Sequence, residues 1–196
     1  SGANLRGADL RAASFDGAIL SGVDLKGVRI DAEAVKKCVL SPDEAAVSRV
    51  PELLKALDDA ELWATSEGQS GASARIDTAD MRPLGTALQN RRLPACRFSD
   101  CRMIECNFSG SVLAGAIFKN CDLRGAVFAG CDLRGARFEN CLLPFADFRE
   151  AQLGAISIGH EQTVGVDFTD SSTVGAHFRP EDLDRLKLVA LGPEAA

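Results

Sequence analysis

Large apolar residues recur at every fifth position over a long stretch of this chain. From Phe98 to Phe148 each fifth residue is Phe, Leu or Met, and the residue two positions before it is Cys, Ala or Ser. A period of five fits neither the 3.6-residue period of a helix face nor the two-residue period of a strand. A fixed internal period is instead typical of a repeat protein, in which stacked units share one core.

The same period is present near the start of the chain, in a different frame. Its central residues there are Leu5, Leu10, Phe15, Leu20, Leu25 and Ile30, and the pattern fades at Glu33, which occupies a small-residue slot. The later pattern continues to Phe178 but weakens after Leu153. The sequence therefore predicts two repeat arrays, a first one over residues 3–42 and a main one over 94–179.

Residues 43–93 are predicted to form a helical insertion and linker between the arrays. The segment Ser-Pro-Asp-Glu from residue 41 is a strong helix start, with a capping Ser and a Glu three positions later. Pro51 opens a second, leucine-rich helix, and residues 67–73 have the composition of a flexible linker. The rest, from 75 to 93, fits two further repeats as well as a short helix.

A short amphipathic helix is predicted over residues 180–191. Pro180 stands in its first turn and acidic residues follow it, as is usual at the start of a helix. Leu183 and Leu186 are its candidate interaction residues. The helix would either cover the open end of the array or pair with a second copy to form a homodimer.

The seven cysteines are interpreted as core residues. Six occupy the small-residue slot of the main array, where a small and weakly polar side chain suits a tight interior. There is no Cys-x-x-Cys motif, and no metal or other cofactor is predicted. Free buried thiols favour a reducing compartment, the cytoplasm. The six are Cys96, Cys101, Cys106, Cys121, Cys131 and Cys141.

Charge and hydropathy exclude several classes of partner. A formal charge of −6 disfavours nonspecific attraction to nucleic acid or to an anionic membrane. No segment approaches the roughly 18 apolar residues of a membrane span. The chain begins with Ser-Gly, and its first repeat starts at Ala3 without a preceding cap. These features favour a fragment of a longer protein.

The repeat unit resembles that of the pentapeptide-repeat family. The resemblance rests on units such as Ala-Asn-Leu-Arg-Gly from residue 3 and Cys-Asp-Leu-Arg-Gly from residues 121 and 131. It implies an all-β solenoid, a right-handed quadrilateral β-helix with coils of about twenty residues. The central and small residues of each unit would point inward. Here the solenoid would be interrupted by the helical insertion and ended by the C-terminal helix.

This geometry sorts the central residues of the main array into four stacks. Small slots beside Phe are mostly Ala and those beside Leu or Met are often Cys, as constant packing density requires. Two facing stacks are rich in Phe and two in Leu. The expected stacks are Phe98, Phe118, Phe138, Ile158 and Phe178; Phe108, Phe128, Phe148 and Phe168; Met103, Leu123 and Leu143; and Leu113, Leu133 and Leu153.

No enzymatic activity is predicted, because no convergent set of nucleophile, base and acid is recognisable. The leading hypothesis is a noncatalytic scaffold or protein-interaction module of unknown partner, within a larger bacterial secretion-associated or effector protein. Candidate interaction residues are Trp63, for which a role as a core aromatic is favoured over binding, and His160 and Glu161 in an irregular loop at 159–163. That loop is either a functional loop or an irregular last coil.

The family resemblance also implies an alternative function. One branch of the family mimics DNA, binds DNA gyrase and protects it from quinolones. The acidic charge and the C-terminal helix fit that branch. However, acids and bases alternate on the outward positions, as in Asp122 with Arg124 and Asp132 with Arg134. Such faces do not resemble a row of phosphates, and the insertion also departs from an uninterrupted solenoid.

Overall fold

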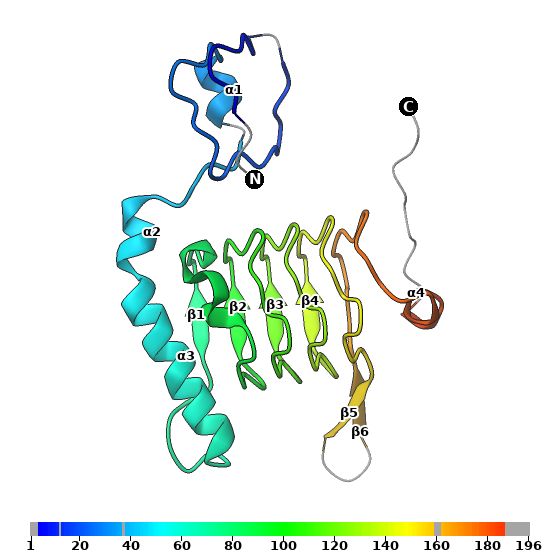
Figure 1. Ribbon diagram of the computed structural model, residues 1–196. Coiled ribbons are helices and arrows are strands. Elements are labelled where there is room, and N and C mark those ends of the chain that lie inside the picture. Colours follow the sequence, from blue (N-terminus) through cyan, green and yellow to red (C-terminus); the bar gives the residue numbers. More distant parts are fainter. Residues whose placement is uncertain (1–3, 12, 37, 159–161, 187–196) are drawn as a thin grey trace. The chain divides into compact units, whose positions relative to one another are not determined.

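The computed structural model describes residues 4–11, 13–36, 38–158 and 162–186 (Figure 1). Its contacts divide the chain into two units, Ser1–Glu44 and Ala45–Ala196. Parallel bridges between residues twenty positions apart occur in both units. A coil of twenty residues is therefore common to the two.

The first unit has a small core. A short helix, α1 (Ala32–Lys36), lies where the repeat fades, since a polar residue in a small slot no longer supports a coil. Leu20 is the one buried apolar side chain among the described residues of this unit. Its parallel bridges join Asp9 with Arg29 and Ile19 with Val39.

Two helices follow, α2 (Glu44–Ser48) and α3 (Val50–Thr65), in the stretch that the sequence predicts to be helical. Pro51 lies in the first turn of α3, where its missing N–H group leaves no hydrogen bond unmade. The helix contacts the first coil of the array, at the strand β1 (Arg75–Asp77) and the 3-10 helix η1 (Arg82–Leu88). Its buried residues are Leu53, Leu57 and Ala60.

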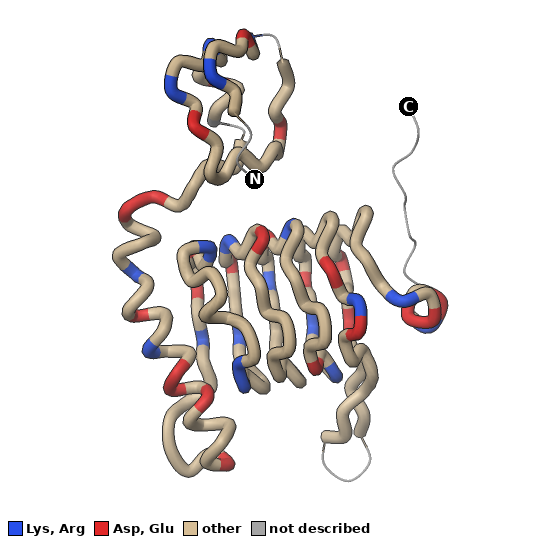
Figure 2. Tube along the Cα trace, viewed as in Figure 1, with Lys and Arg blue, Asp and Glu red and all other residues tan. Residues whose placement is uncertain are grey.

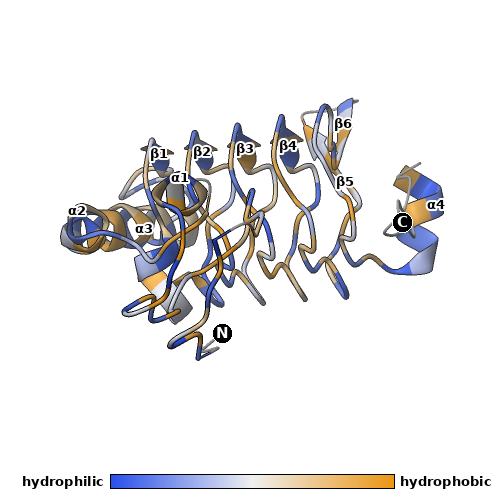
Figure 3. Cartoon of the chain, turned by 90° about the horizontal axis from the view of Figure 1, so that it is seen from above, coloured by the Kyte–Doolittle hydropathy of each residue, from blue (hydrophilic) through white to orange (hydrophobic). Residues whose placement is uncertain are grey.

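Four short parallel strands form one side of the main array. After β1 come β2 (Arg97–Ser99), β3 (Ile117–Lys119) and β4 (Arg137–Glu139), hydrogen-bonded in sequence order. Figure 3, seen from above, shows them in a row along one side of the coils. Their central residues, in register, are Ile76, Phe98, Phe118 and Phe138.

The stacked coils begin earlier than the sequence analysis placed them. Residues 75–93, counted there with the helical insertion and linker, form a coil, because β1 pairs with β2 and Arg92 bridges Val112. The step from Ile76 to Phe98 is two residues longer than the later steps of twenty. The helix η1 lies inside this coil and breaks the period, which explains why the pattern is hard to recognise there.

The other three sides of the coils are joined by isolated parallel bridges. One bridge per side recurs every twenty residues, so each regular coil contacts the next on four sides. The inward positions are filled by Phe, Leu, Met, Ala and Cys, all nearly inaccessible to solvent. The bridges are Arg102–Asp122–Leu142, Asn107–Val127–Asp147 and Val112–Asp132–Gln152.

The phenylalanine rings form two parallel stacks. Phe118 lies 5.1 Å from Phe98 and 4.9 Å from Phe138, and Phe128 lies 5.2 Å from Phe108, all measured between ring centroids. Rings of opposite stacks meet edge to face at 5.4–6.4 Å. This arrangement combines stacked and edge-to-face contacts, the two favoured geometries for aromatic pairs.

The last coil does not follow the expected spacing. A β-hairpin, β5 (Ala155–Ile158) and β6 (Gln162–Gly165), interrupts the array. Arg137 therefore bridges Asp167, thirty positions on, and Phe168 stacks on Phe138 at 4.9 Å. The expected stacks, with Ile158 on Phe138 and Phe168 on Phe148, were wrong at this end. Ile158 is 50% exposed instead, and Phe178 stacks on Phe148 at 4.7 Å.

The array ends in a short helix, α4 (Pro180–Leu186). Asp182, in its first turn, is buried and accepts hydrogen bonds from Arg179 and Arg185 at 2.8 and 2.7 Å. Leu186 packs against the core. The rest of the helix predicted over residues 180–191 lies outside the described residues.

Candidate functional site

The cysteines of the main array belong to its interior. The Cys131 thiol donates a hydrogen bond to the carbonyl oxygen of Phe108 in the preceding coil, with Sγ 2.9 Å from the oxygen. Burial raises the pKa of Cys131 to about 12, and that of Cys106 also to about 12. Thiols with pKa values this high stay protonated near neutral pH, whereas the thiolate is the nucleophilic form. All seven cysteines of the chain are free.

The outward surface of the coils carries a repeated ion pair between an aspartate and the arginine two residues later. In one example, Arg134 Nε and Nη2 donate to the Asp132 carboxylate at 2.9 and 2.7 Å, and the Arg134 backbone N–H also donates to it, at 3.2 Å. Arg134 holds the pKa of Asp132 below its usual value. The same pair recurs as Asp9–Arg11, Asp80–Arg82, Asp122–Arg124 and Asp147–Arg149.

Two adjacent coils depart from this polar surface and present an apolar patch, defined here as Leu142 and Phe145 of one coil and Val174 of the next. Their exposed fractions are 47%, 67% and 39%. Phe145 occupies a corner that is glycine in the neighbouring coils, at Gly125 and Gly175, and its φ of +61° is unfavourable for a bulky residue. Its ring lies against Gly175, where an added Cβ would come within 2.8 Å of it.

The candidate interaction residues from the sequence lie apart. Trp63 is half-buried on α3 and borders the loop that follows, since a Cβ on Gly68 would lie 3.5 Å from its Nε1. Leu183 and Leu186 are half-buried on α4. His160 and Glu161 lie outside the described residues.

The sequence analysis missed the apolar patch. Its signal was present, because the segment Leu142-Leu143-Pro144-Phe145 stands where other coils read Asp-Leu-Arg-Gly. The inward period does not reveal it, because Leu143 keeps the period while the outward Asp, Arg and Gly are replaced by Leu, Pro and Phe.

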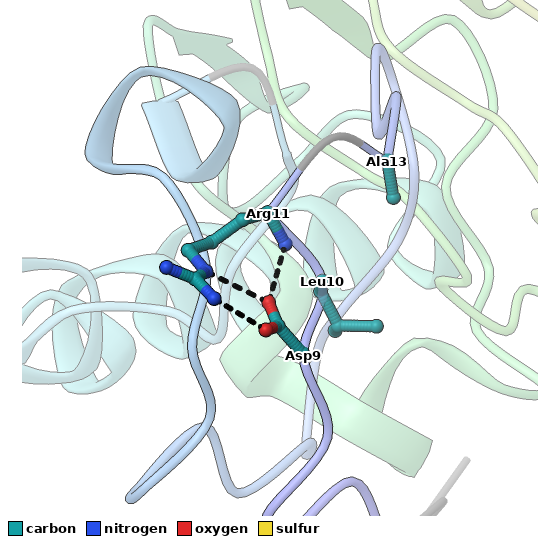
Figure 4. Close-up of a pocket in the computed structure, with 4 residues that line it drawn as sticks. All are labelled: Asp9, Leu10, Arg11 and Ala13. Atoms are coloured by element: carbon teal, nitrogen blue, oxygen red, sulfur yellow. Dashed lines mark hydrogen bonds and ion pairs between the residues drawn. The ribbon is translucent and has the colours of Figure 1, made fainter.

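The first unit has an open hollow of about 440 Å³, lined by Asp9, Leu10, Arg11 and Ala13 (Figure 4). Asp9 and Arg11 form the repeated ion pair, and three hydrogen bonds join them. Arg11 also lowers the pKa of Asp9. The two charged groups therefore satisfy one another, and the hollow offers little to a ligand.

Among the described residues, no group of three His, Cys, Asp or Glu side chains is placed to hold a metal ion. In the same part of the chain, no helix is long and apolar enough to cross a membrane.

Solved structures of three related proteins resemble parts of the chain. QnrB1, a plasmid-mediated fluoroquinolone resistance protein, is 24% identical over 54% of this chain and 51% of its own, with a TM-score of 0.43. A pentapeptide repeat protein of the Arabidopsis thaliana thylakoid lumen is 27% identical over 50% of this chain and 77% of its own, with a TM-score of 0.35. HetL, involved in the regulation of heterocyst differentiation in the cyanobacterium Nostoc, is 19% identical over 59% of this chain and 44% of its own. Its TM-score is also 0.35.

These scores are below 0.5, so the likenesses carry no argument about function, and this chain spans only about half the length of QnrB1. No curated protein matches the chain. The family model described as "Pentapeptide repeat region" matches residues 101–178, and that described as "Pentapeptide repeats (8 copies)" matches residues 1–30. Together they cover more than half of the 196 residues, and the chain belongs to the pentapeptide-repeat family.

Proposed function

We propose that this chain is a noncatalytic scaffold that binds another protein through the outward surface of its coils. The observation that carries this proposal is the apolar patch of Leu142, Phe145 and Val174. A phenylalanine two-thirds exposed at a left-handed corner forgoes most of the stability that burial of its ring would give, and it bears a cost in backbone strain. A partner that covers the ring would offset that cost, as buried aromatic anchors do at protein interfaces.

The proposal includes the architecture that the family implies. Four bridges per coil support a quadrilateral β-helix, and we assign its coils the right-handed winding of the family. It also includes two arrays separated by a helical insertion, with residues 75–93 as the first coil of the second array. A homodimer through α4 and a reducing, cytoplasmic setting also remain proposals. The free cysteines support the second of these.

Replacing the two largest residues of the patch should abolish partner binding. With tagged protein as bait in a bacterial lysate, we expect a partner that the wild type retains and the Leu142→Ala/Phe145→Ala variant loses. The matched control is Leu62→Ala on α3, which is similarly exposed at 49% and lies outside the patch. A partner retained equally by all three proteins would contradict the role of the patch.

The structure gives no support to the alternative of DNA mimicry. Asp122, Asp132 and Asp147 are each paired with the arginine two residues later, which interrupts any row of negative charge along these sides. We therefore expect micromolar protein to leave DNA gyrase supercoiling unchanged, with or without a quinolone. The assay compares supercoiled and relaxed plasmid on a gel. Protection of gyrase from the drug would reverse this assignment.

A further inference from the structure

The side of the array formed by β1–β4 differs in charge from the other three sides. Where a charged pair flanks the central residue on those sides, the aspartate precedes it and the arginine follows it, as in Asp122 and Arg124. Arg102, which precedes its central residue, lies in register between Asp80 and Asp122. On β1–β4 the order is reversed, with a base before the central residue in three of the four strands. The bases, called here the arginine row, are Arg75 and Arg97 on adjacent strands and Arg137, which follows after Ile117 in the register.

The reversed order leaves most of these cations without a partner. An aspartate that precedes its arginine also accepts the arginine's backbone N–H, which fixes the pair; an arginine that comes first cannot use that bond. Within the described residues, Arg75, Arg97 and the neighbouring Lys119 make no ion pair. Arg137 contacts Glu139 only loosely, at 3.6 Å.

The sheet register places like charges side by side. Arg75 and Arg97 are direct partners on adjacent parallel strands, roughly 4.8 Å apart, and both are exposed. Like charges in such positions destabilise a sheet. The chain has 28 acidic and 22 basic residues, so adjacent bases do not arise from an excess of base. Basic segments recur along these strands in Figure 2.

The row is also held rigidly. Each arginine flanks a fully buried central residue, and the Phe98, Phe118 and Phe138 rings beneath are stacked at 4.9–5.1 Å. The backbone positions from which the arginines extend are therefore set before any partner arrives, so that only their side chains have to be ordered on binding.

We propose that the arginine row binds an acidic segment of a partner protein. The row is one side chain wide and has carboxylates beside it at Asp77, Asp100 and Glu139. It therefore fits a single line of carboxylates, whereas the flanking acids repel a polyanion broad enough to lie over them, such as duplex DNA. A helix with acids on one face repeats them about every 5.4 Å, close to the roughly 4.8 Å between coils.

The proposal is tested with a fluorescein-labelled peptide of about ten glutamates, whose binding is followed by fluorescence anisotropy. The wild type should bind it with an affinity that falls as salt rises. The Arg75→Ala/Arg97→Ala variant should lose about tenfold in affinity, as expected for two exposed ion pairs. The matched control, Arg134→Ala/Arg149→Ala, removes the same charge from other sides and should bind the peptide within about twofold of the wild type.

Three results would overturn the proposal. They are no binding by the wild type, an equal loss in the control, or tighter binding of a short DNA duplex than of the peptide. The melting temperature of the Arg75→Ala/Arg97→Ala variant should be no lower than that of the wild type, because repulsion between the arginines is relieved. A lower melting temperature would show that the two arginines stabilise the fold. The inference rests on the proposed function but uses another surface, so the lysate experiment on the apolar patch can succeed or fail separately.

Discussion

Replacing Phe128 with alanine is expected to lower the free energy of unfolding by about 3–5 kcal/mol. Phe128 is completely buried, and its ring is stacked between Phe108 at 5.2 Å and Phe148 at 5.1 Å. Phe118 and Phe138 meet it edge to face at 5.7 and 5.6 Å. The substitution therefore leaves a cavity bordered by four rings that the coil bridges hold in place. Chemical denaturation of the purified protein measures the loss.

The matched control is Phe145→Ala, because the same side chain is 67% exposed there. We expect the stability of this variant to change by no more than about 0.5 kcal/mol. A conservative Phe128→Leu variant should recover most of the loss, since it returns apolar volume to the stack. Equal stability of Phe128→Ala and the wild type would show that the rings do not form the core of the array.

The five-residue period predicts the stacking of the regular coils but not an insertion whose length is a multiple of five. It accounts for the stack of Phe98, Phe118 and Phe138, because twenty residues make one coil. It could not reveal the β5–β6 hairpin. The detour delays the last coil by ten residues, which is two whole repeats, so Phe168 and Phe178 keep the frame of five while they change sides. Since Phe recurs every ten residues, ring still stacks on ring after the change.

The hairpin also shows why a glycine can be needed at a corner. Ile156 lies over Gly135, where an added Cβ would come within 2.5 Å of its Cγ1 and 3.1 Å of the Val164 carbonyl oxygen. Gly135 has a φ of +66° as well. From the sequence, this glycine is one of several at equivalent corners. Only the structure shows that a second segment lies on it.

Outward residues are the least predictable part of the chain. Only a few kinds of side chain fit the inward slots, so the period predicts these residues reliably. An outward position contacts solvent and accepts almost any residue. The sequence pointed to Trp63 and to the last helix, but the patch around Phe145 becomes visible only through its exposure and its positive φ. The arginine row likewise depends on register, because Arg75 and Arg97 belong to coils whose spacing is irregular.

Replacing Leu57 with alanine should lower the free energy of unfolding by about 2–4 kcal/mol. Leu57 is completely buried on α3, beside Leu53 and Ala60, in the same core as Met81 and Leu88 of the first coil. The control is Leu62→Ala on the same helix, which is 49% exposed and should change stability by about 0.5 kcal/mol or less. Denaturation curves of the two variants and the wild type give the comparison.

The Leu57 result bears on the whole array because a solenoid has two bare ends. A first coil without a cover exposes its apolar interior and a row of unpaired backbone groups, which invites edge-to-edge association. Helix α3 prevents this by burying Leu57 and by ion pairs from Arg91 to Asp58 and Glu61. If α3 is such a cover, Leu57→Ala should speed hydrogen exchange in the first coil, at Ile76 and Met81, before it affects Phe128. Faster exchange confined to α3 would instead show that the helix does not stabilise the first coil.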